Sequence, residues 1–229
     1  MAKRQPAGRS DESAERTPAR RLTPKGEATR ARLIEIAAEL FAEEGYGAVS
    51  IRDVANRSGL SSGAIYGTFR GKADLLAEAV DAMIAAEVES LPTAVLERSL
   101  PEIEAYQYEH ASDRARVRAL LLEAAAAART DPDVRARLRE TMLPRIEMAT
   151  AAQEEWRDRA GVDPKLDMRA LVVLLWAADL GLAVLDATGV ELPDAKDWSE
   201  LMRRLLMSLE SPDAHPGSPT PRVTPRRKR

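Results

Sequence analysis

The feature that most constrains this sequence is an amphipathic helical stripe followed by short segments that end at glycines. Apolar residues recur at three- and four-residue intervals from Leu33 to Phe41, which is the spacing of one face of an α-helix. Gly45 ends this stripe, Gly59 interrupts the next segment, and Gly71 precedes a longer one. Because glycine readily ends helices, the pattern in this region predicts a group of short helices rather than a sheet.

The remainder of the chain also has helical spacing, and no segment alternates apolar and polar residues as a half-buried strand does. Pro132 follows Asp131 at a first-turn position, Asp163-Pro164 signals another helix start, and Thr188-Gly189 marks a helix end. The sequence therefore predicts an all-α fold, with helices at about 27–44, 51–58, 61–69, 72–90, 101–111, 113–129, 132–159, 165–188 and 195–209.

Composition divides the chain into a helical body and two basic ends. Residues 1–30 carry eight Lys and Arg against four Asp and Glu, and residues 216–229 carry five Lys and Arg and no acid, although the net charge is −3. Residues 1–26 and 211–229 are rich in Arg, Pro, Ser and Gly and poor in apolar residues, so we expect both to be disordered. The body divides into a three-helix domain at 27–75 and a larger helical domain at 76–210.

Residues 51–69 have the features of a helix-turn-helix, in which two short helices cross closely at a tight turn. Ala55 is the small residue that the crossing needs, and Gly59, four positions later, suits a turn position that favours positive φ. Val54, Leu60 and Ile65 are the apolar residues expected to lock the pair to the rest of the domain. An ordinary helical hairpin that binds nothing also fits this pattern.

The stretch from Thr29 to Leu76 resembles the N-terminal domain of the TetR family of bacterial regulators. The motifs that carry the resemblance are ELFAEEGY, SIRDVANRSGLSSGAIYGTF and GKADLL, in that order. The resemblance implies a three-helix DNA-binding domain with a helix-turn-helix, joined by a long helix to a larger helical domain for ligand binding and dimerisation. It also implies a sequence-specific transcriptional regulator, a repressor released from its operator by a small-molecule effector.

The resemblance places the short third helix in the major groove, with base edges nearest its N-terminal end. Tyr66 and Lys72 match family positions that contact phosphates, whereas Gly67 stands where the family often has His. The third helix has small outward residues, so we expect DNA shape to carry much of the specificity. The expected DNA contacts are Ser50, Arg52, Ser61, Ser62, Gly63, Ala64, Tyr66, Gly67, Thr68 and Lys72.

The basic ends give a separate hypothesis. Arg16, Arg20, Arg21 and Lys25 precede the first helix, where a basic arm could follow the DNA backbone or enter a minor groove. A solvated tail is the alternative. The same two interpretations hold for the C-terminal run from Arg226 to Arg229.

The helix at 165–188 is apolar nearly all round, so we expect it to be buried on several sides. The last helix has an apolar stripe as well. The resemblance implies that these two helices form a four-helix bundle across a two-fold axis, which gives a homodimer on a pseudo-palindromic double-stranded DNA operator. The expected interface residues are Leu171, Leu174, Leu175, Leu182, Leu185, Trp198, Leu201 and Leu205.

The family's larger domain usually holds an effector pocket. The Ala- and Leu-rich helices favour a hydrophobic or amphipathic effector, and the sequence indicates no metal site and no cofactor. The candidate ligand contacts, each of which also fits a core or surface position, are Met83, Tyr106, Tyr108, His110, Leu122, Met142, Trp176 and Asp179.

The sequence also bears on two other classes of protein. An enzyme is disfavoured because there are two histidines, no cysteine, and no H-E-x-x-H, P-loop or G-x-G-x-x-G motif. A helical protein–protein interaction module that has lost DNA binding stays open. No apolar stretch in residues 1–30 suggests secretion, and the run from Leu171 to Leu185 is shorter than the ~20 residues of a membrane span. We therefore expect a cytoplasmic protein with no membrane partner.

Overall fold

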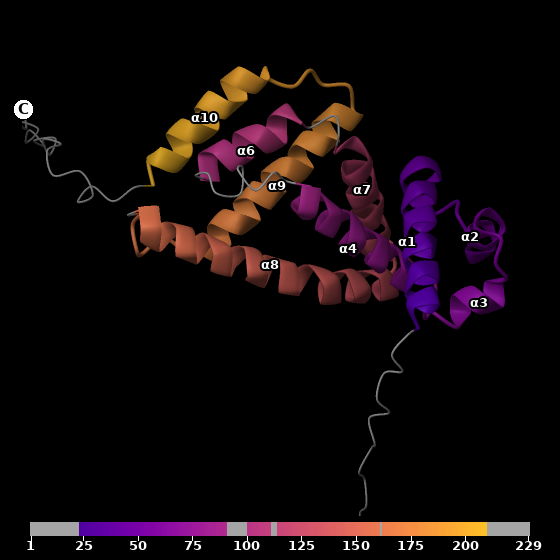
Figure 1. The fold of residues 1–229 in the computed structure, drawn as a ribbon. Helices are drawn as coiled ribbons and strands as arrows, with labels where there is room; N and C mark the ends of the chain where they lie inside the picture. The colour runs from indigo at the N-terminus through magenta and orange to yellow at the C-terminus, as the bar shows by residue number, and fades with distance from the viewer. Residues whose placement is uncertain (1–22, 91–99, 111–113, 161, 210–229) are drawn as a thin grey trace, which may run out of the picture.

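The structure is a computed structural model that describes residues 23–90, 100–110, 114–160 and 162–209. Its helices are arranged as a small group formed by α1, α2 and α3 and a larger group that carries α6, α9 and α10 at the opposite end (Figure 1). The all-α prediction is confirmed. The helices are α1 (Pro24–Glu44), α2 (Ile51–Ser58), α3 (Ser62–Tyr66), α4 (Lys72–Ser90), α6 (Leu100–Glu109), α7 (Ala115–Thr130), α8 (Pro132–Ala160), α9 (Met168–Ala187) and α10 (Ala195–Met207).

Helix α1 begins three residues earlier than the sequence indicated. The Thr23 side chain accepts a hydrogen bond from the Gly26 amide at 3.3 Å, and Pro24 occupies the first turn, where its missing N–H costs nothing. Residues 24–26 are therefore helical rather than disordered. The other expectations for the basic ends, including DNA contacts of Arg16, Arg20 and Arg21, concern residues outside the described part of the chain.

The α2–α3 pair forms as expected, because its ends are fixed by local hydrogen bonds. The Asp53 amide donates to Ser50 Oγ at 3.3 Å and the Ser50 amide donates to Asp53 Oδ2 at 2.8 Å, which is a capping box. Gly59 has φ of 73°, in the left-handed region that lets the chain turn into α3. Helix α3 ends at Tyr66, a few residues before the expected end near Phe69.

One of the three apolar residues expected to lock the pair, Leu60, is exposed rather than buried. Val54 and Ile65 are fully buried, but the Leu60 side chain is 36% exposed, so Leu60 contributes little to holding the pair in place. It directly follows the left-handed Gly59, where the chain turns at the surface.

The core formed by α1, α2 and α3 continues into the larger group. Leu33, Phe41 and Phe69 form one buried cluster that also includes Leu120 of α7 and Val134 of α8. Helix α4 packs against α1, α7 and α8, and α7 packs against α1, α8 and α9. The orientation of α2 and α3 is therefore tied to the larger group through α1 and α4.

Helix α9 is less buried than the sequence indicated. It begins at Met168, three residues later than expected, because Asp167 caps it and the Asp163 side chain instead accepts from the Lys165 amide in a preceding turn. The helix has 20 residues, more than the apolar run from Leu171 to Leu185 on which the sequence prediction was based. By length and composition alone, it is long and apolar enough to cross a membrane. Only 22% of its apolar window is buried within the chain, since its packing partners cover one side.

Candidate nucleic-acid interface

The start of α2, the helix α3 and the start of α4 surround a surface hollow of about 470 Å³. Five of the ten expected DNA contacts meet there, which brings together residues that are up to 22 positions apart in the chain. They are Ser50, Arg52, Ser62, Tyr66 and Lys72, and the remaining lining residues are Gly47, Ala48, Val49 and Ile51.

Ser50 has a positioning role in this hollow. Its hydroxyl donates to Asp53 Oδ2 at 2.6 Å while accepting from the Asp53 amide. These hydrogen bonds from Ser50 lower the pKa of Asp53, and the positive charges of Arg52 and Lys72 lower it further. The carboxylate thus uses the hydroxyl proton that was expected to reach a phosphate, and Ser50 instead fixes the N-terminus of α2.

Tyr66 and Arg52 remain available for contact. The Tyr66 side chain is 60% exposed, the Arg52 side chain is exposed, and both line the hollow. A phenolic hydroxyl and a guanidinium group beside the first turn of α2 present hydrogen-bond donors that suit a phosphate.

Lys72 is the first residue of α4, and its ammonium is held by an aromatic ring. Lys72 Nζ lies 4.1 Å from the centroid of the Tyr46 ring, a cation–π distance. Burial lowers the pKa of Lys72, whereas the negative charges of Asp131 and Asp53 act in the opposite direction. Lys72 also lines the hollow, together with Tyr66.

The other five expected contacts lie at the N-cap of α3, on α3 and in the turn that follows it. Ser61 Oγ accepts from the Ala64 amide at 3.2 Å as the cap of α3, and Thr68 Oγ1 donates to the Ala64 carbonyl at 3.2 Å. Both hydroxyls are therefore engaged locally. Gly63, Ala64 and Gly67 are exposed and carry at most a methyl group, so this face of α3 presents mainly backbone.

Sequence reasoning assigned no site role to Tyr46 or to the backbone of Gly47 and Ala48. The only available signal was that Tyr46 ends the motif ELFAEEGY. Its contact with Lys72, 26 positions away, depends on how α1 meets α4 and has no local sequence signature.

Most of the expected ligand contacts are engaged within the chain. Tyr106 stacks on His110 with ring centroids 4.0 Å apart, and Tyr108 donates its hydroxyl to the Pro193 carbonyl at 2.6 Å. Asp179 forms ion pairs with Arg114 at 3.1 Å and with Arg118 at 2.8 Å. Met142 packs against the main core, and Leu122 and Trp176 are half-buried.

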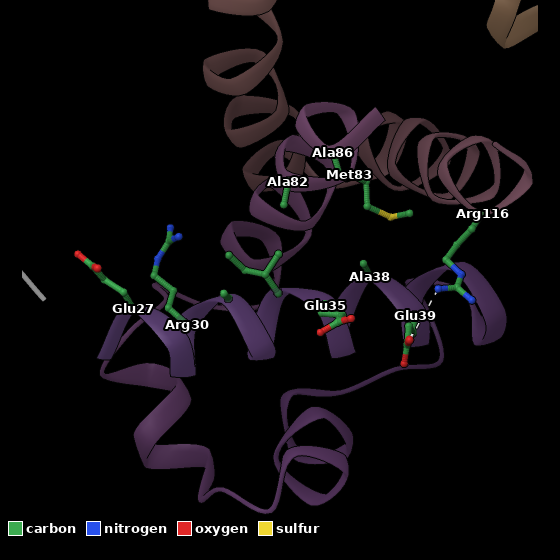
Figure 2. A pocket seen from close by; sticks show the side chains of 11 residues that line it. Glu27, Arg30, Glu35, Ala38, Glu39, Ala82, Met83, Ala86 and Arg116 are labelled. Carbon is green, nitrogen blue, oxygen red and sulfur yellow. Dashed lines mark ion pairs between the residues drawn. The ribbon is translucent and has the colours of Figure 1, made fainter. Parts of the chain in front are cut away.

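Met83 lines a groove between α1 and α4 of about 640 Å³ (Figure 2). The floor is apolar and the rim is charged, with an ion pair of 3.7 Å between Arg116 of α7 and Glu39 of α1. None of the other seven ligand candidates lines this groove. Its residues are Glu27, Arg30, Ala31, Ile34, Glu35, Ala38, Glu39, Ala82, Met83, Ala86 and Arg116.

The expected interface residues divide into two sets. Leu171, Leu175 and Leu182 are buried within the chain itself, and Trp198 is half-buried and stacks on Tyr108 with centroids 5.0 Å apart. The second set, together with other exposed side chains of the same two helices, forms what we call the α9–α10 apolar residues. These are Val173, Leu174, Val184, Leu185, Leu201, Leu205 and Met207, and Leu174 is 63% exposed.

The residues described by the structure contain no group of three His, Asp or Glu side chains arranged to hold a metal ion. The polar groups that the structure gathers at the surface hollow are instead hydrogen-bond donors and cations. A short helix pair that turns at a left-handed glycine, with such groups beside an exposed helix, defines a helix-turn-helix DNA-binding domain.

Comparison with known proteins specifies this class. Residues 33–79 match the sequence profile of the bacterial regulatory proteins of the TetR family. The HTH-type transcriptional regulator AcrR of Shigella flexneri is 33% identical over 60 residues, which are 26% of this chain and 28% of AcrR. The match thus spans less than a third of this curated relative.

The likeness in fold extends over most of the chain. A putative TetR-family transcriptional regulator from Rhodococcus sp. superposes with a TM-score of 0.68 at 16% identity, covering 81% of this chain and 100% of that one. The transcriptional regulator FadR of Bacillus subtilis, solved in complex with stearoyl-CoA, gives a TM-score of 0.61 at 20% identity, covering 78% and 97%. The larger helical group therefore has the same fold as in these regulators.

Proposed function

We propose that this protein is a sequence-specific DNA-binding transcriptional regulator that represses its target genes and leaves its operator when a small molecule binds. The observation that carries the DNA-binding part is the surface hollow, where Arg52, Tyr66 and Lys72 converge beside the exposed backbone of α3. A phosphate in this hollow fixes the register, and α3 meets base edges in the major groove.

The small side chains of α3 set how the operator is read. Gly63, Ala64 and Gly67 offer no long donors, so direct hydrogen bonds to bases are few. Backbone approach, apolar contact with thymine methyls, bridging waters and DNA shape supply the remaining specificity.

Specific binding also needs a second half-site, which a dimer supplies. The α9–α10 apolar residues support this step, because so many exposed leucines and valines on two neighbouring helices favour burial against a partner. On α9, Leu174 and Leu185 share one side with the exposed Ala177 and Gly181, and these small residues let two helices approach closely. A homodimer on a pseudo-palindromic operator is the result.

The groove between α1 and α4 supports the effector part of the proposal. It has the volume of a small-molecule site, and it separates the helix that carries α2 and α3 from the first helix of the larger group. A ligand that fits only one α1–α4 distance changes the separation of the two helix-turn-helix domains in the dimer. It therefore shifts the DNA-binding equilibrium. The FadR structure solved with stearoyl-CoA shows that a similar fold accommodates an amphipathic ligand.

The test is selection of bound fragments from the source genome, followed by gel shift with the enriched sequence. We expect one family of sites with two related half-sites at a fixed spacing. Tyr66→Phe and Lys72→Ala should weaken binding to all fragments roughly uniformly, whereas Lys165→Ala, an exposed lysine in the turn before α9, should not. Absence of any enriched sequence would favour a helical interaction module that has lost DNA binding.

A further inference from the structure

Tyr46 lies where the DNA-facing hollow meets the larger helical group. It follows α1 and Gly45, and its half-buried ring packs on Phe41 with centroids 5.5 Å apart. Lys72 Nζ lies 4.1 Å from the centre of the same ring. Of these residues, Lys72 also lines the hollow, whereas Tyr46 is not among its lining residues.

The backbone of Tyr46 is fixed by a residue from α7. The Tyr46 amide donates to Glu123 Oε2 at 3.0 Å, which joins the turn after α1 to a helix 77 residues further along the chain. Gly45 has φ of 86°, and a Cβ atom built there would lie 3.2 Å from Glu123 Oε2. The glycine thus permits both the turn and the close approach of the carboxylate.

The surroundings of the ring favour a neutral phenol. Burial, together with the charges of Asp131 and Asp133 at the α7–α8 corner, raises the pKa of Tyr46 to about 12. The charge of Asp131 also raises the pKa of Lys72, against the effect of burial. The ring therefore stays uncharged and the ammonium has acidic residues nearby.

We propose that Tyr46 is a positioning residue for DNA binding, whose ring holds the Lys72 ammonium at the edge of the hollow and whose backbone is fixed by Glu123. A lysine side chain is flexible, and confining it in the free protein reduces the entropy lost when it meets a phosphate. This inference rests on the proposed DNA-binding function. It adds a residue that touches no DNA yet sets the affinity.

The test is a double-mutant cycle on the salt dependence of affinity for a selected operator fragment. Lys72→Ala should reduce the slope of log affinity against log salt by about one phosphate contact. Tyr46→Phe keeps the ring and should match the wild type. Tyr46→Leu removes it and should weaken binding about threefold, the size of a partly exposed cation–π contact. In the Lys72→Ala background, Tyr46→Leu should cause no further loss.

A matched pair at Glu123 gives an independent measurement. Glu123→Gln keeps an acceptor for the Tyr46 amide and should bind like the wild type. Glu123→Ala removes the acceptor and should weaken binding in the wild-type background but not in the Lys72→Ala background. This arm decides the proposal if Tyr46→Leu fails to fold, as judged by circular dichroism and thermal midpoint.

Two negative outcomes are distinguishable. If Lys72→Ala leaves the salt slope unchanged, the phosphate contact in the proposed function is wrong and the role of Tyr46 is lost with it. If Lys72→Ala lowers the slope but the losses from Tyr46→Leu or Glu123→Ala add fully to it, the phosphate contact stands and the positioning role is overturned.

Discussion

The surface hollow and the α9–α10 apolar residues are both unpartnered in the single chain, yet they differ in chemistry. The hollow gathers an ammonium, a guanidinium and a phenol, and helix caps fix the backbone around it. The other region presents leucines and valines along α9 and α10. One surface is built for a charged partner, and the other for burial against an apolar one.

The difference predicts opposite responses to salt. Phosphate contacts release condensed counterions, so DNA affinity through the hollow falls steeply as salt rises. Apolar burial does not depend on ion release, so pairing through α9 and α10 should be insensitive to moderate salt. A substitution in the hollow should therefore leave pairing intact, whereas one that breaks the pair through α9 should also lower operator affinity, because one half-site is lost.

The largest effect is expected from Leu174→Glu. A charge at this 63% exposed position should be readily solvated in the single chain but costly when buried against a partner. We expect monomers by light scattering and an operator affinity lower by roughly a hundredfold or more, because one half-site is lost. The control is Met148→Glu, an exposed methionine on α8. A dimer that survives Leu174→Glu would place the interface elsewhere.

A smaller effect is expected from Lys72→Ala. Removing one charge-assisted phosphate contact should lower affinity about tenfold, or roughly 1.4 kcal/mol, on specific and non-specific DNA alike. Titrations by fluorescence anisotropy on both DNAs measure this, and light scattering should show an unchanged dimer. A loss confined to the specific sequence would mean that Lys72 reads bases instead.

The smallest effect is expected from Ser50→Ala, which removes the cap of α2. The free energy of unfolding should fall by about 1 kcal/mol, measured by urea denaturation. DNA affinity should fall only modestly, because the Ser50 hydroxyl already donates to Asp53. A loss in affinity as large as that of Lys72→Ala with unchanged stability would show that Ser50 contacts phosphate directly.

Local features were predictable from the sequence, because their physics is local. The left-handed Gly59 and most of the helix boundaries follow from residues a few positions apart. The residues of the hollow were predictable in part. The family-like spacing of Tyr66 and Lys72 indicated a phosphate-binding surface, and five of the ten expected DNA contacts line the hollow.

What escaped prediction depends on tertiary packing. Leu171 and Leu174 look alike in the sequence, but the neighbours of α9 bury the first and leave the second exposed. The groove beside Met83 arises from two helices whose lining residues are about fifty positions apart. The contact between Tyr46 and Lys72 likewise exists only once α1 and α4 are packed.

The helix-turn-helix and the helices α9 and α10 are separate parts of the chain, and this separation has a genetic consequence. Under the proposed assembly, a chain that has lost Tyr66 and Lys72 still presents Leu174 and Leu185 on α9. Such a chain pairs with an intact copy and leaves it only one working half. A defective allele expressed beside the normal gene therefore depletes functional pairs in proportion to its dosage, so loss-of-contact alleles should be dominant in trans, whereas alleles that damage α9 should be recessive.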